Sequence, residues 1–324
     1  MKKNTRFLLI VILLILLGII FFMGINSVKD AKIVSLQEKT KGIMILIEYK
    51  DTIGLANFVN EMQKRDIYSL LQVDSEFVEA NCDTIKKLTD YNVELVAANI
   101  QDPFWGISYE IQKSRIIEMK DKIESCTGKP IRIISSRYMA SDLNTIKIAE
   151  ELNIPYVVAR GTTDSKATVY SIEGYNTKVL SISNIPKVQY KYGSLCDYSY
   201  YERSGTPEDM KAELMRSIES LTNKEKERYG QYQRVTPVSH TNIGGYLKPW
   251  MNMWVDFWDT TKDKVEWVDL DTFMENYDWI LPEWQLPINK NAPYTPEKIR
   301  PLTPYEEIEK VSNPCRVDLL PYIN

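Results

Sequence analysis

The chain has almost no histidine. His240 is the single histidine among 324 residues. A zinc site made of two or three imidazoles therefore cannot be built from one chain. A Ser–His–Asp or Cys–His arrangement would have to include His240. Any hydrolytic chemistry must rely on carboxylates or on this one imidazole.

The chain also lacks an excess of positive charge. It carries 40 Lys and Arg residues against 44 Asp and Glu residues, which gives a formal net charge of −4. Because no basic stripe is present either, we expect no nucleic-acid partner. With 44% hydrophobic and 26% charged residues, the composition is that of a folded globular protein with a sizeable core.

One long apolar run stands at the N-terminus. Lys2, Lys3 and Arg6 precede an apolar stretch from Phe7 to Ile25. This stretch is long enough to cross a hydrocarbon core of about 30 Å. The positive flank places the rest of the chain on the extracytoplasmic side. We expect residues 1–25 to be an uncleaved membrane anchor. A cleaved signal peptide is the alternative, although no A-x-A site follows.

Four cysteines, Cys82, Cys126, Cys196 and Cys315, follow the anchor. Their spacing matches no zinc ribbon or C-x-x-C motif. An even number in an exported domain permits two disulfides in one of three pairings. Because Cys82 and Cys126 fall on consecutive predicted helices, we expect the pairs Cys82–Cys126 and Cys196–Cys315. Buried free thiols are the alternative.

Predicted strands and helices alternate along the middle of the chain. Strands are predicted at residues 42–48, 68–73, 93–98, 131–135 and 156–159, and helices at 55–62, 77–88, 109–126 and 143–152. A further helix begins at Thr206–Asp209, and later strands end at His240 and cover 265–270. Trp250, Trp254 and Trp258 recur every four residues, which predicts one buried helix face. The pattern is typical of an α/β fold with a parallel sheet, open or closed into a barrel.

The order of these segments resembles a known family, the polysaccharide deacetylases of carbohydrate esterase family 4. The segments that carry the resemblance are Leu71–Glu79, Leu88–Pro103, Ser125–Tyr138, Leu143–Val158 and Val235–His240. The resemblance implies an irregular (β/α) barrel with its site at the carboxyl ends of the strands. We therefore expect an anchor at 1–25, a linker at 26–40, the barrel at 41–280, and a Pro- and aromatic-rich arm at 281–324 packed on the barrel.

The functional motifs of this family are mostly missing. Its Asp-Asp pair corresponds to Glu48–Tyr49, and its His-x-x-x-His pair falls on Ala98 and Asp102. Its Arg-Pro-Pro-Tyr motif survives only as Arg137–Tyr138. Zinc is expected in the family, but an alanine supplies no ligand, and the Lewis acid that activates water has no obvious source. We therefore expect neither a metal nor another cofactor.

The resemblance implies that Glu48 is the base and His240 the acid. The other candidates, all substrate-binding, are Asp74, Asp102, Trp105, Arg137 and Tyr138. Each has a structural alternative: Glu48 could pair with Lys50 or Arg137, Asp74 could cap a helix, and Asp102 could form a turn. His240 could be a satisfied buried histidine. Trp105 lies in a loop expected at the rim, where its ring could stack on a sugar.

Three functions remain open. The first is a membrane-anchored, extracytoplasmic protein that binds a glycan or cell-envelope polysaccharide without zinc-dependent catalysis. The second is a hydrolase that cleaves N-acetyl bonds of a polysaccharide through Glu48, Asp102 and His240. The third is a structural subunit of an envelope complex. The missing ligands favour the first and third, and the framework favours the first and second.

Overall fold

The computed structural model describes residues 39–48, 53–100, 103–104, 106–159, 167–183, 194–201, 205–218, 234–275 and 280–281. Contacts divide the chain into Met1–Lys39 and Thr40–Asn324, and the architecture below is that of the second unit. The predicted anchor lies outside the described residues, as does almost all of the predicted arm at 281–324. Within the described ranges, no helix is long and apolar enough to cross a membrane.

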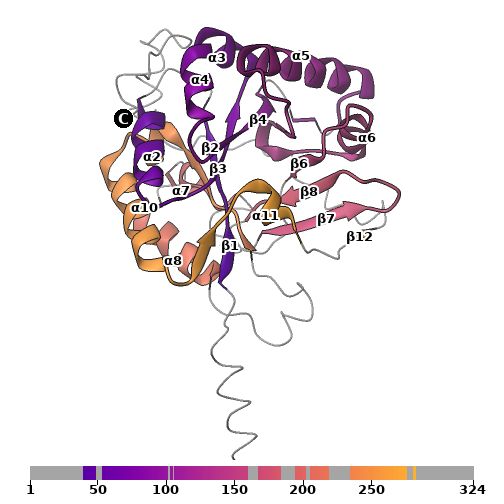
Figure 1. Cartoon of the computed structure of the whole chain (residues 1–324). Helices are drawn as coiled ribbons and strands as arrows, with labels where there is room; N and C mark the ends of the chain where they lie inside the picture. The colour runs from indigo at the N-terminus through magenta and orange to yellow at the C-terminus, as the bar shows by residue number, and fades with distance from the viewer. Residues whose placement is uncertain are drawn as a thin grey trace, which may run out of the picture. The chain divides into compact units, whose positions relative to one another are not determined.

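A mainly parallel sheet forms the centre of this unit (Figure 1). Its nine strands are, in spatial order, β10 (Val238–His240), β2 (Met44–Ile47), β3 (Ser69–Val73), β4 (Val93–Asn99), β5 (Ile133–Ser136), β6 (Tyr156–Ala159), β8 (Lys178–Ser181), β7 (Thr168–Ile172) and β12 (Ile280–Leu281). Neighbours from β10 to β8 pair in parallel. β7 runs antiparallel to β8, and β12 pairs in parallel with β7.

A second, three-stranded parallel sheet has the order β11 (Val265–Trp267), β1 (Thr40–Gly42) and β9 (Arg234–Val235). β1 leads directly into β2, and β9 leads into β10, so the two sheets share the same chain segments. In the described part of the chain, β10 and β12 are the two edges of the larger sheet and do not pair with each other. The predicted barrel is therefore an open, curled sheet, because no strand pairing closes it.

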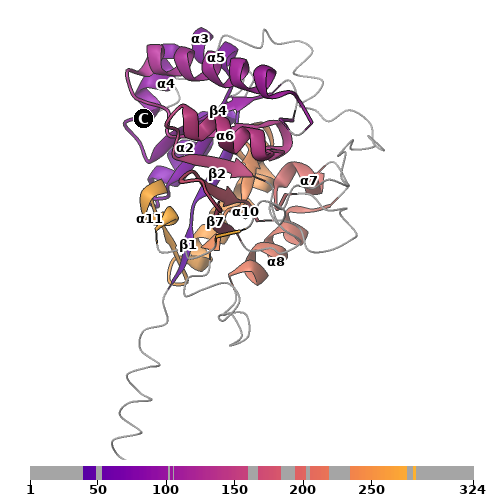
Figure 2. The same cartoon turned by 90° about the vertical axis from the view of Figure 1, so that its right-hand side faces the viewer.

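Helices pack on this sheet in two groups (Figures 1 and 2). α3 (Ser75–Ala80), α4 (Cys82–Leu88) and α6 (Leu143–Glu151) contact α5 (Tyr109–Thr127). α7 (Asp197–Tyr201) and α10 (Lys248–Thr261) contact α8 (Pro207–Ser217). The remaining helical elements are α2 (Gly54–Gln63), α11 (Leu270–Met274), a 3₁₀ turn η1 (Arg137–Met139) and a π-helix η3 (Thr241–Gly245).

Local sequence signals explain most of these boundaries. Thr206 caps α8 with the predicted geometry, since its hydroxyl accepts from the Asp209 N–H and the Asp209 side chain accepts from the Thr206 N–H. α5 ends at Gly128, whose φ of 71° is the left-handed conformation that glycine adopts without strain. The single helix predicted at 77–88 is instead two helices. They are separated by Asn81, whose side-chain amide donates to the Phe77 carbonyl.

The tryptophan stripe of α10 is buried, as predicted. Trp250, Trp254 and Trp258 all have exposures below 5%. The rings of Trp254 and Trp258 stack with centroids 6.0 Å apart, and Phe58 of α2 meets both rings edge-on. Such aromatic pairs add to the hydrophobic gain from burial. The stripe therefore attaches α10 to the core.

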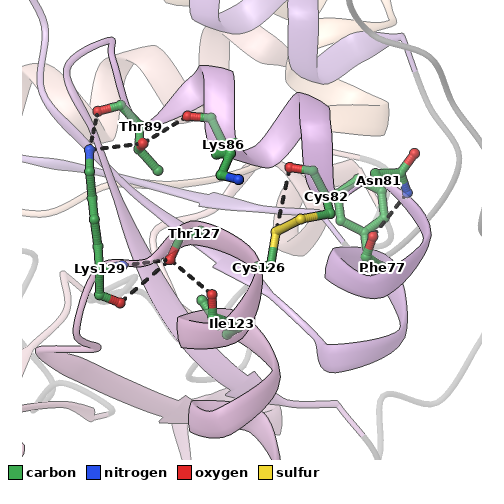
Figure 3. The surroundings of a disulfide bond; sticks show 9 residues. All are labelled: Phe77, Asn81, Cys82, Lys86, Thr89, Ile123, Cys126, Thr127 and Lys129. Atoms are coloured by element: carbon green, nitrogen blue, oxygen red, sulfur yellow. Dashed lines mark hydrogen bonds between the residues drawn. A yellow bond between two sulfur atoms is a disulfide. The ribbon is translucent and has the colours of Figure 1, made fainter.

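A disulfide joins α4 to α5 through Cys82 and Cys126, which confirms the first predicted pair (Figure 3). Nearby, the Lys129 ammonium donates to the carbonyl and hydroxyl of Thr89, at 3.1 and 2.9 Å. The second predicted pair, Cys196 with Cys315, differs in outcome. Cys196 is a buried free thiol, and Cys315 lies outside the described residues.

Candidate functional site

The first candidate, Glu48, follows β2 and is buried. β10 pairs with β2 in parallel, with His240 opposite Ile47. This register brings the next residues, Glu48 and Thr241, together, and the Thr241 hydroxyl donates a hydrogen bond to the Glu48 carboxylate. A buried carboxylate needs such a donor to offset its loss of water. Glu48 thus links the end of β2 to the start of η3.

The second candidate, His240, is the last residue of β10 and retains 26% exposure of its side chain. Its Nδ1 atom lies 3.4 Å from the Cys196 sulfur and 3.6 Å from Asp197 Oδ1. The Tyr198 ring packs against the imidazole with centroids 4.9 Å apart. A parallel bridge between Cys196 and Val238 explains this arrangement, because it holds the start of α7 against β10.

Asp197 is fully buried and is the best-anchored member of this group. Its Oδ1 accepts hydrogen bonds from the backbone N–H groups of Tyr198 and His240, at 2.7 and 2.9 Å. Its Oδ2 accepts from the Ser239 hydroxyl at 2.5 Å. Hydrogen bonds from several donors offset the desolvation of a buried carboxylate. They also fix the orientation of the carboxylate toward the imidazole.

Competing influences act on the pKa of His240. Burial lowers this pKa, but electrostatic interaction with Cys196 and hydrogen bonding to Asp197 outweigh burial and raise the pKa to about 10. The acid role expected for His240 stays a prediction.

The third candidate, Asp74, caps α3: its carboxylate accepts from the Phe77 N–H at 2.6 Å. This is the structural alternative expected from the sequence. Arg137 and Tyr138 follow β5, with the guanidinium 5.0 Å from the Tyr138 ring centroid. Tyr138 has a φ of 58° and is 36% exposed. Asp102 and Trp105 lie outside the described residues. Substrate contacts by these residues stay predictions.

The position expected for a metal-binding histidine is occupied by Ala98 on β4. Ala98 is buried and pairs with Ser135 of β5. The Ser135 hydroxyl in turn accepts from the Gln72 amide of β3 at 2.9 Å. This part of the sheet thus holds a neutral hydrogen-bonded pair and an apolar side chain. It offers no imidazole and no thiolate to a metal.

Cys196, Asp197 and Ser239 were not among the residues selected from the sequence for chemistry. The structure brings all three to His240, and the donor atoms of Cys196, Asp197 and His240 lie within 4.8 Å of one another. Two signals were available: the Cys-Asp dipeptide before a short helix, and the polar Ser239 beside the single histidine. Neither signal shows that these segments meet, because 43 positions separate Asp197 from His240.

Comparisons with known proteins identify the fold. No family model matches the sequence, and no curated protein matches it. Among solved structures, a Mycobacterium smegmatis protein named as a polysaccharide deacetylase has a TM-score of 0.57 at 10% identity, covering 74% of this chain and 91% of its own. A Pseudomonas aeruginosa PAO1 protein of the same name has a TM-score of 0.55 at 10% identity, covering 72% of this chain and 90% of its own.

A third structure, PuuE allantoinase, has a TM-score of 0.54 at 10% identity and covers 74% of this chain and 90% of its own. Its name differs from that of the other two, so the shared architecture by itself does not define a substrate. At these identities the comparisons concern the fold. This chain has a polysaccharide deacetylase-like fold.

Proposed function

We propose that this protein binds a cell-envelope polysaccharide on the extracytoplasmic side of a membrane, without the zinc-dependent hydrolysis expected of the deacetylase family. The observation that carries the proposal is Ala98, a buried alanine where the family resemblance places a metal-binding histidine. Glu48, at the position of the family's carboxylate base, is buried and hydrogen-bonded to Thr241. A carbohydrate ligand is supported by the names of two of the structural neighbours.

The extracytoplasmic location is supported by two features. The Cys82–Cys126 disulfide is typical of proteins that fold in an oxidising compartment. The apolar run from Phe7 to Ile25 has the length of a membrane span and a positive flank at its start. We expect the full chain to fractionate with membranes. Recovery of a soluble mature form that begins near Asn26 would contradict the anchor.

The glycan-binding surface is proposed to lie at the carboxyl ends of the parallel strands, where concave sites of such folds are built. Tyr138 is exposed there, directly after β5, and Trp105 follows β4 in the sequence. Aromatic faces stack on sugar rings, while mixed donors and acceptors suit hydroxyl groups.

The test is binding of the detergent-solubilised full chain to an array of cell-envelope glycans. Trp105→Ala and Tyr138→Ala are each expected to weaken binding by about 1–3 kcal/mol, the scale of one buried aromatic contact. Tyr156→Ala is the matched control, because Tyr156 is the first residue of β6 and so lies at the amino ends of the parallel strands, away from the proposed surface. Unchanged binding in both rim variants, with the fold intact, would favour the structural-subunit alternative.

A parallel assay separates binding from catalysis. The full chain is incubated with an N-acetylated polysaccharide, and acetate release is measured. We expect no release above the level of a heat-denatured sample. Sustained release that is lost in a His240→Gln variant would overturn this part of the proposal. It would support the alternative hydrolase that uses Glu48 and His240.

A further inference from the structure

The group around His240 contains three atoms of the kinds that bind metals, a sulfur, a carboxylate oxygen and an imidazole nitrogen, and they lie close together. The Cys196 sulfur lies 3.4 Å from His240 Nδ1 and 3.9 Å from Asp197 Oδ1. The third edge, between Nδ1 and Oδ1, measures 3.6 Å. The three atoms therefore form a nearly equilateral triangle, although they belong to two segments of the chain.

These three distances are close to those between neighbouring ligand atoms around one metal ion. Zinc binds sulfur at about 2.3 Å, and imidazole nitrogen and carboxylate oxygen at about 2.0–2.2 Å, with tetrahedral angles. Such bond lengths place neighbouring ligand atoms about 3.3–3.6 Å apart. The nitrogen edges of the triangle fall in this range, and the sulfur–oxygen edge is only slightly longer. An ion can therefore contact all three atoms with small side-chain adjustments.

The surroundings also fit a metal site. Asp197 is fully buried, and the Ser239 hydroxyl with the backbone N–H groups of Tyr198 and His240 orients its carboxylate. Supporting hydrogen bonds of this kind hold first ligands in place in metal sites. Cys196 is 3% exposed, whereas the His240 side chain keeps 26% exposure, so one side of the triangle is open to entry.

We propose that Cys196, Asp197 and His240 bind a divalent thiophilic metal ion of the zinc class. Three protein ligands leave a fourth tetrahedral position for water or a ligand group. This site uses the start of α7 and the end of β10, and it does not involve Ala98. It is independent of the proposed glycan binding, so failure of either proposal leaves the other standing.

The test is titration of the full chain with Co²⁺, which reports a bound thiolate through a sulfur-to-cobalt charge-transfer band. We expect one ion per chain, the visible bands of tetrahedral cobalt and a charge-transfer band. Zinc should displace the cobalt. Cys196→Ser should abolish the charge-transfer band. His240→Gln should lower the metal affinity at least tenfold, because changing a residue that only supports a ligand already lowers affinity about 10- to 100-fold.

Cys315→Ser is the matched control, because it removes the other cysteine outside the Cys82–Cys126 disulfide. This variant should keep both the band and the affinity. Absence of the band in folded wild-type protein would overturn the proposal, as would its survival in Cys196→Ser or its loss in Cys315→Ser. If Cys196→Ser does not fold, the Cys315→Ser spectrum decides, since its remaining free thiol is Cys196.

Discussion

The two halves of the sheet are built differently. From β2 to β5, each strand is followed by helical segments, and every pairing from β2 to β6 is parallel. From residue 167 onward, the sheet contains the antiparallel β7–β8 pair, and β10 leads into a π-helix. In the first half, a disulfide links α4 to α5. The second half contains the cluster of Cys196, Asp197 and His240.

The regular first half and the irregular second half of the sheet hold different kinds of side chain. In the first half, the position expected for a metal ligand holds Ala98, and the Gln72 amide donates a hydrogen bond to the Ser135 hydroxyl. In the second half, a sulfur, a carboxylate oxygen and an imidazole nitrogen lie within 4.8 Å of one another at His240. Irregular segments bring such groups together because they are less constrained by the repeat of strand and helix. A π-helix next to a polar group is consistent with this, since π-bulges frequently occur at functional sites.

The largest expected effect tests the stabilising role of the first half. Replacing both Cys82 and Cys126 with Ser should lower the free energy of unfolding by about 2–4 kcal/mol, because the cross-link no longer restricts the unfolded chain. Urea unfolding of the full chain measures the loss. Cys315→Ser is the control, since it removes a cysteine without opening the Cys82–Cys126 cross-link. An equal or larger loss in this control would break the comparison.

An intermediate effect tests whether the second half is tightly packed despite its irregular backbone. An added Cβ at Gly244 would lie 2.1 Å from the Ser239 hydroxyl oxygen and 2.7 Å from Asp197 Oδ2. Gly244→Ala should therefore cost about 1–3 kcal/mol through overpacking. It should also shift the NMR signals of His240, which are unambiguous because the chain has one histidine.

Gly174→Ala provides the contrast for this experiment. Gly174 has a φ of 87° and nothing within 4 Å of an added Cβ, so alanine there strains the backbone without crowding a neighbour. The His240 signals should stay unchanged in this variant. If Gly244→Ala leaves these signals in place as well, the packing around Asp197 is looser than the distances indicate.

The smallest expected effect concerns an ion pair that connects the halves. Arg132 donates to Asp271 of α11 at 2.7 and 2.9 Å, and also to Glu94 of β4. Hydrogen bonding to Arg132 is the main cause that lowers the pKa of Asp271. Because Asp271 is largely exposed, we expect a contribution below about 1 kcal/mol.

The sign of its pH dependence follows from the direction of the shift. A carboxyl whose pKa is lowered by folding stabilises the protein above its unfolded pKa, about 3.9 for aspartate. This contribution is lost as the pH falls through the folded pKa. Wild type and Asp271→Asn should therefore differ in unfolding free energy at neutral pH and converge in acid. A constant difference across this range would show that the ion pair contributes nothing.

Much of the secondary structure in both halves could be predicted from the sequence because its signals are local. Strand-length apolar runs, the Thr206 capping box, the Gly128 helix end and the stripe at Trp254 each depend on neighbouring residues. The break at Asn81 was missed because both sides of it are helical. The Cys82–Cys126 pair was accessible as well, since it follows from two consecutive helices.

Only the tertiary structure decided the arrangement around His240. The approach of Cys196 and Asp197 depends on the bridge to Val238, and the contact of Glu48 with Thr241 depends on the register of β2 and β10. The same holds for the antiparallel β7 and the open edges of the sheet. The physical reason is that periodicity and capping specify backbone conformation over a few residues. Contacts between distant segments arise from strand pairing and loop closure, which no local pattern encodes.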